Sequence, residues 1–121
     1  MNKDEIDHRA ERVRHYLREA SFFEAEADTV ELLKRQAMDP NLTIGGHALI
    51  LRMLGAVSVS EKLTARGARI RIGDGEGIHV GTGPTTTDAL VDLIRNVAAW
   101  KRKRAEDMRA VAKSYEPENE P

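Results

Sequence analysis

The residues best suited to binding chemistry gather in one stretch, which reads ARIRIGDGEGIHVGTGPTTTDALVDL and runs from Ala68 to Leu93. Its alternating apolar residues predict a β-hairpin, and the glycines and threonines that follow predict a tight corner leading into a capped helix. Unpaired N–H groups at a helix N-terminus attract anions, and arginines beside them would add positive charge. We therefore expect a nucleotide or another phosphate-bearing ligand at this hairpin–helix corner. The candidate contacts are Arg69, Arg71, His79, Gly81, Gly83, Thr85, Thr86 and Thr87.

The same stretch also fits a purely structural turn, in which the threonines cap the helix and the arginines are simply solvated. The apolar pattern favours a hairpin register that pairs Ile72 with Ile78 and Ile70 with Val80. That register would set Arg71 opposite His79 on the solvent face. In this register the basic side chains of the hairpin would lie beside the hairpin–helix corner.

Other patterns in the chain give weaker indications of chemistry. Asp4, His8, Glu11 and His15 would share one helical face, but the arginines around them favour a salt-bridged surface over a metal site. The basic run at 101–104 points all round a helix, so it does not form one phosphate-binding stripe. No nucleophile elbow, zinc-protease helix or calcium loop occurs. We expect a non-enzymatic protein with no catalytic residues, no metal and no cofactor.

Composition limits the partners. The chain has 121 residues and a formal net charge of −1, which gives no general attraction for nucleic acid or membranes. Residues 61–113 are nevertheless basic, with eleven Lys or Arg against seven Asp or Glu. There is no cysteine, and the first residues are charged and unlike a signal peptide, so we expect a cytoplasmic protein. The excess of arginine over lysine suggests a bacterial or phage source.

The periodicity of apolar residues predicts an α+β chain that is mostly α, with one two-stranded antiparallel hairpin and a long C-terminal helix. We expect one α-rich domain over residues 1–113 and a disordered acidic tail over 114–121. The last helix would be about 42 Å long at 1.5 Å per residue and would overhang so small a domain, which favours a homo-oligomer. The expected segments are helical 3–38, helical 43–66 as one helix or as 44–55 and 59–66, hairpin 68–82, and helix 85–113.

Two stretches resemble known families. The order strand, strand, Gly-x-x-x-Thr-x-x-Asp-Ala-Leu over residues 68–100 is similar to the strand-to-helix step of HicB-type antitoxins, although the loop between the strands is shorter. Residues 44–82 resemble a winged helix, in which the helix at 59–66 would enter the DNA major groove. These resemblances imply a DNA-binding regulator as the alternative function.

Three functions therefore stand in order. The first is a small binding protein, perhaps a phage or bacterial accessory or anti-defence factor, that takes a phosphate-bearing ligand. The second is a DNA-binding regulator, with nucleic acid possible but not favoured. The third is a protein–protein inhibitor without a small ligand.

Overall fold

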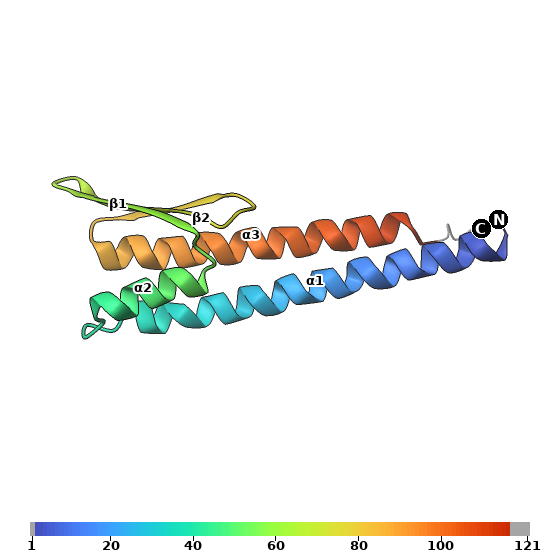
Figure 1. Cartoon of the computed structure of the whole chain (residues 1–121), viewed down its shortest axis with the longest axis horizontal. Helices are drawn as coiled ribbons and strands as arrows, with labels where there is room; N and C mark the ends of the chain where they lie inside the picture. The colour runs from blue at the N-terminus through green and yellow to red at the C-terminus, as the bar shows by residue number, and fades with distance from the viewer. Residues whose placement is uncertain (1, 117–121) are drawn as a thin grey trace. The chain divides into compact units, whose positions relative to one another are not determined.

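The computed structural model describes residues 2–116, which form three helices and one antiparallel sheet of three strands (Figure 1). The expectation of an α+β, mostly α chain is confirmed, but the expected two-stranded hairpin is wrong because a third strand precedes it. The elements in chain order are α1 (Lys3–Ala37), α2 (Ile44–Met53), β1 (Ser58–Thr64), β2 (Gly67–Gly73), β3 (Ile78–Gly83) and α3 (Thr86–Ser114).

The additional strand is β1, and it takes the place of the helix expected at 59–66. Val59 and Leu63 are four residues apart, a spacing that suits one face of a helix and also one face of a strand. The strand period prevails because β1 pairs with β2 along its whole length, from Ser58 opposite Gly73 to Thr64 opposite Gly67. The helical segment expected over 43–66 therefore ends at Met53, and the winged-helix arrangement loses the helix that would read DNA.

The other helices follow the sequence pattern. α1 is continuous from Lys3 to Ala37, although Ser21 and Glu24 have the spacing of a capping box that could start a new helix there. α3 begins after Thr85, whose Oγ1 accepts a hydrogen bond from the Asp88 N–H at 3.1 Å and donates one to the Asp88 carboxylate at 2.8 Å. Most of the predicted acidic tail, residues 117–121, lies outside the described residues. Within the described part of the chain, no helix has the length and hydropathy needed to cross a membrane.

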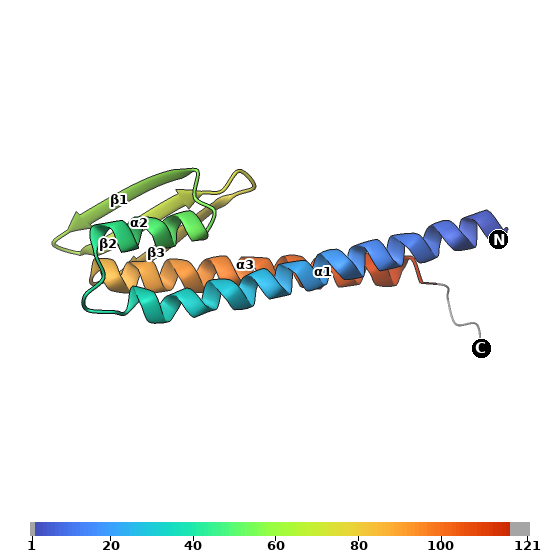
Figure 2. The same ribbon diagram turned by 60° about the horizontal axis from the view of Figure 1, so that its bottom comes forward.

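The chain divides into two compact units, and each is described by itself. Residues 27–100 form the larger unit and contain the whole sheet. Its core joins the end of α1, α2, one face of the sheet and the first half of α3, with Ile50, Ile70 and Leu93 almost fully buried. The sheet lies on α3 in both ribbon views (Figures 1 and 2).

The smaller unit combines the two ends of the chain, residues 1–26 and 101–121. Within its described part, alanines are buried on both helices, and the rings of Tyr16 and Tyr115 stack at 5.9 Å. Ion pairs join the same helices: Lys101 bonds to Glu26 at 2.6 Å, and Arg109 bonds to Glu24. The buried alanines are Ala20, Ala105 and Ala112. The second half of α3, which was expected to overhang the domain, therefore packs on α1 of the same chain. This removes one motive for expecting an oligomer.

The observed register of β2 and β3 differs by one residue from the sequence prediction. Ile72 lies opposite His79 and Ile70 opposite Gly81, so Arg71 faces Val80 and not His79. The cause lies at Gly81, where a Cβ atom would be 2.1 Å from the carbonyl oxygen of Ala89 and 2.5 Å from the Leu93 nitrogen. Only glycine permits so close an approach to α3, so position 81 must take the inner face.

Replacing Gly81 with alanine should destabilise the protein by about 1–3 kcal/mol or more, because the added methyl group meets main-chain atoms of α3 that have no room to move. The measurement is the free energy of unfolding in urea. Gly77→Ala is the matched control, since a Cβ there meets no atom within 4 Å. Equal stability of the two variants would contradict the close approach.

Candidate anion-binding site

The sheet has one face on the core and one in solvent, and the register decides which side chains each face carries. Ala68, Ile70 and Ile72 of β2 are buried, so the residues between them point outward. Side chains directly opposite each other on neighbouring strands share a face. Two rows therefore cross the outer face. One is Lys62, Arg69 and Thr82, and the other is Ser60, Arg71 and Val80.

We call the outward-facing cations Lys62, Arg69 and Arg71, together with Arg66 in the turn between β1 and β2, the basic sheet face. All four side chains are exposed, and within residues 2–116 none of them forms an ion pair with a carboxylate. Four like charges without counter-ions raise the local positive potential and favour an anionic ligand.

A shallow hollow of about 540 Å³ lies at the end of this face where β1, β2 and the end of β3 meet. Three of the four cations, Lys62, Arg66 and Arg69, line it. The Thr64 hydroxyl closes the turn beside it by accepting from the Arg66 N–H at 3.2 Å. The remaining lining residues are Thr64, Gly67, Ala68, Thr82, Gly83 and Pro84. Cations and hydroxyl groups around one hollow make a suitable set of partners for phosphate oxygens.

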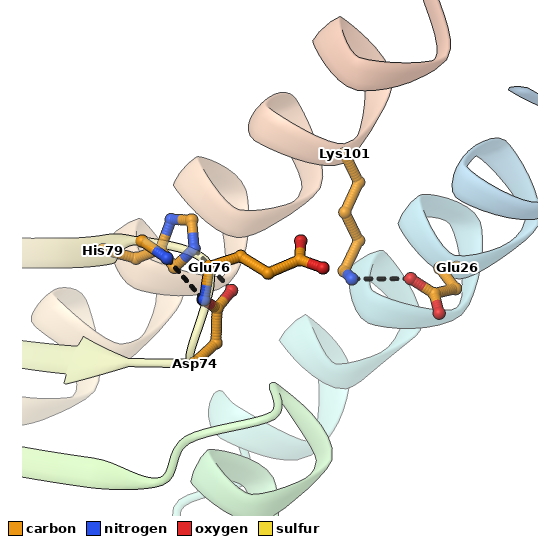
Figure 3. A network of polar contacts seen from close by, with 6 residues as sticks. Glu26, Asp74, Glu76, His79 and Lys101 are labelled. Atoms are coloured by element: carbon orange, nitrogen blue, oxygen red, sulfur yellow. Dashed lines mark hydrogen bonds and ion pairs between the residues drawn. The ribbon is translucent and has the colours of Figure 1, made fainter. Parts of the chain in front are cut away.

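His79, predicted as an anion contact, lies on the other face of the sheet. Its side chain is buried, and its Nε2 is 2.9 Å from the carboxylate of Asp74 (Figure 3). The ring centroids of His79 and Trp100 are 5.2 Å apart in an edge-to-face arrangement. It is therefore separated by the sheet from Arg69 and Arg71. Gly81 also faces inward, against α3.

Asp74 organises the loop between β2 and β3. Its Oδ1 accepts from the N–H groups of Glu76 and Gly77, both at 2.8 Å, while its Oδ2 meets His79. Burial pushes the pKa of Asp74 upward, but the Glu76 N–H, the His79 ring and the Gly77 N–H stabilise the carboxylate and hold its pKa below the usual range. With Gly73 paired to Ile78, the loop has four residues, one more than the expected register would leave, as the register shift imposed at Gly81 requires.

The predicted corner is less suited to anions than the basic sheet face. The hydroxyl of Thr85 is used by its own capping bonds to Asp88. Thr87 lines a neighbouring hollow of about 460 Å³ that shares Thr82, Gly83 and Pro84 with the first. Its charged lining residues are Asp88, Asp92 and Arg95, so the carboxylates outnumber the cation and oppose an anion. Thr86 is the first residue of α3 and is exposed. Of the predicted contacts, Arg69 and Gly83 both line the hollow at the end of the basic sheet face. Arg71 lies on the same face, in the neighbouring cross-strand row.

Lys62, Thr64 and Arg66 were missed as site residues because 59–66 was expected to be a helix. The available signal was the polar alternation Ser58, Ser60, Lys62, Thr64. Elsewhere, among the described residues, no group of three or more His, Cys, Asp or Glu side chains is placed to hold a metal ion.

No family model, curated protein or solved structure matches the chain. The function is therefore argued from the geometry of its own residues.

Asp74→Asn should lower the free energy of unfolding at neutral pH by about 1.5–3 kcal/mol, because a neutral amide replaces a buried, hydrogen-bonded carboxylate. A lowered folded-state pKa gives stability that is complete above the ordinary carboxyl pKa of about 4. That stability disappears as the pH falls through the lowered pKa of Asp74. The difference in free energy of unfolding between wild type and Asp74→Asn should therefore become smaller in acid. Unfolding in urea from pH 7 to pH 2 measures it.

Glu11→Gln is the control, since this carboxylate on α1 is exposed and its replacement should change stability by less than about 0.5 kcal/mol. A gap between wild type and Asp74→Asn that stays constant down to pH 2 would refute the role given to the Asp74 carboxylate.

Proposed function

We propose that this chain is a non-enzymatic binding protein that captures a small phosphate-bearing ligand, such as a nucleotide, on the basic sheet face. The observation that carries the proposal is the hollow bordered by Lys62, Arg66 and Arg69, three cations that pair with no carboxylate of residues 2–116. Arginine presents a planar fork of N–H donors that matches two phosphate oxygens at once, and lysine adds a compact charge.

The position of these cations supports a rigid site. Lys62 and Arg69 are direct cross-strand neighbours, so their Cα atoms are held about 5 Å apart by the sheet. Arg66 sits in a two-residue turn that Gly67 closes with a φ of 132°. A Cβ at Gly67 would be 2.6 Å from the Gly83 oxygen, so the turn is pressed against the end of β3. Backbone pairing fixes where these side chains start, so a ligand has to order only the exposed side chains and not the main chain that carries them.

A sequestering role is favoured over catalysis because no acid or base lies among the cations. Two acid–histidine pairs occur in the larger unit, Asp74 with His79 and Glu61 with His47, and both lie on the core side of the sheet, away from the cations. A protein that holds a phosphate compound without changing it fits the accessory or anti-defence role considered from the sequence.

Nucleic acid is the second candidate, because the same cations would also contact a phosphate backbone. The sheet face offers no aromatic side chain on which bases might stack, which makes a single-strand platform of the usual kind less suitable. The strand at 58–64 also takes the place of the proposed recognition helix. A nucleic-acid partner would therefore be held through its phosphates alone, with a steep dependence on salt.

Binding can be tested by thermal denaturation and calorimetry with ATP, tripolyphosphate and a short DNA duplex. A small phosphate ligand should raise the melting temperature, and Arg69→Ala should weaken its binding roughly tenfold or more through the loss of a charge-assisted bidentate contact. Arg35→Ala is the matched control, since it removes an exposed arginine of α1 that lies off the sheet.

Three results would contradict the proposal. Equal weakening by both variants would indicate general electrostatic attraction. Stabilisation by the duplex alone, lost steeply between 50 and 200 mM salt, would favour nucleic acid. No shift with any compound would leave the basic sheet face without the proposed role.

A further inference from the structure

The two edges of the sheet differ in whether other elements bond to their main chain. At the β3 edge, the Thr82 N–H donates to the Asp92 carboxylate at 2.9 Å, and the Asn96 amide donates to the Val80 carbonyl at 2.7 Å. Side chains of α3 thus occupy main-chain groups that another strand would need. Covering an edge in this way is a common protection against strand addition.

The β1 edge has no such cover. All seven of its residues are exposed, and within residues 2–116 no side chain from another element bonds to its main chain. The strand lies on the outside of the sheet (Figure 2). A free strand edge presents unpaired N–H and C=O groups, which are a template for a further strand.

An apolar groove of about 700 Å³ runs beside this open edge, between α2 and the inner side of β1. Ile44 and Leu49 of α2 and Val59 of β1 line it, and they are 92%, 51% and 48% exposed. Leu63, 72% exposed, stands on the same side of β1 two places beyond Glu61. Large apolar side chains beside a free edge are typical of an interface.

We propose that a second copy of this chain occupies this edge, with the two β1 strands paired antiparallel about a two-fold axis at Glu61. The pattern of β1 is self-complementary in this register alone. Val59 then faces Leu63 of the second copy, and the reciprocal pair repeats the contact on the other side of the axis. On the outer face Ser60 faces Lys62 of the second copy.

The neighbouring registers are less favourable. An axis at Ser60 would set Val59 against Glu61 of the second copy. An axis at Lys62 would bring the two lysines together and set Glu61 against Leu63, and directly opposed like charges destabilise a strand pair. The two-fold axis keeps the inner faces of both sheets on the same side, so inner residues must pair with inner residues. An axis midway between two residues would pair an inner residue with an outer one, so the axis must pass through a residue.

The Glu61-centred register does bring two carboxylates together, and an inward charge on an edge strand often guards against pairing. Here each Glu61 carries its own partner, because its carboxylate is bonded to the His47 ring of α2. The axis would therefore be surrounded by two carboxylates and two imidazoles. Both α2 helices would lie on the same side of the joined sheet, so that Ile44 and Leu49 of both copies line the seam.

Pairing at β1 would also extend the outer face. Lys62 of the second copy would stand beside Ser60 and add a cation to the row that contains Arg71. The two basic sheet faces would become one surface. The pairing itself does not depend on anion binding, so each proposal can fail alone.

Cysteine cross-linking tests the axis, and the chain has no native cysteine to interfere. Glu61→Cys places one thiol from each copy at the two-fold axis, within the 7 Å Cα separation that a disulfide requires. In the control Ser58→Cys, the two thiols would be six residues apart along the strand, or about 20 Å. On mild oxidation Glu61→Cys should give a covalent dimer and Ser58→Cys should remain monomeric. Equal cross-linking of both variants would overturn the register.

Sedimentation at micromolar concentrations tests the interface without new cysteines. The full chain should sediment at about twice its 13.5 kDa mass, and Leu63→Asp should weaken dimerisation at least tenfold. Ile78→Asp is the matched control, since Ile78 is an exposed apolar residue of β3, at the closed edge. Unchanged melting curves would show that both variants fold. A chain that stays monomeric to several hundred micromolar, or one that both substitutions disrupt equally, would overturn the proposal.

Discussion

The close approach of β3 to α3 at Gly81 is the constraint on which the rest of the larger unit depends. A strand that touches a helix main chain has no room for a side chain, so glycine is fixed on the inner face. Antiparallel pairing then assigns every residue of the sheet to a face, because successive side chains alternate. Ile70, paired with Gly81, therefore lies on the same inner face and is buried in the core.

The consequences extend to both faces. On the core side, His79 is buried with a single carboxylate partner, and Asp74 closes the loop through the same contact. On the solvent side, β1 and β2 carry cations, while Glu61 points to the inner face and Asp74 and Glu76 lie in the loop between β2 and β3. The separation of charge between the faces follows from the register and does not require any long-range interaction.

The sequence alone allowed the helices at both ends, the second and third strands and the cap at Thr85 to be predicted, because each has a strong local signal. Prediction failed at β1, where the spacing of Val59 and Leu63 fits both a helix and a strand. It also failed for the register of β2 and β3, where the contact of Gly81 with α3 overrode the pattern of apolar residues. Two apolar residues of β3, the exposed Ile78 and the partly buried Val80, suggested the wrong face. Arg69 was predicted for the site, but Lys62 and the turn residue Arg66 were not, because the helical spacing of Val59 and Leu63 was followed in place of the polar alternation along β1.

The hydrogen bonds from Thr82 to Asp92 and from Asn96 to Val80 limit how large a strand-built assembly can become. With one edge occupied by helix side chains, a sheet of this kind can be extended from one side only. Two copies joined at their open edges would present an occupied edge at each end, so the assembly would be closed at a finite size. A sheet with two open edges has no such limit and can grow into fibres. The carboxylate and amide of α3 therefore act as a terminator for growth of the sheet.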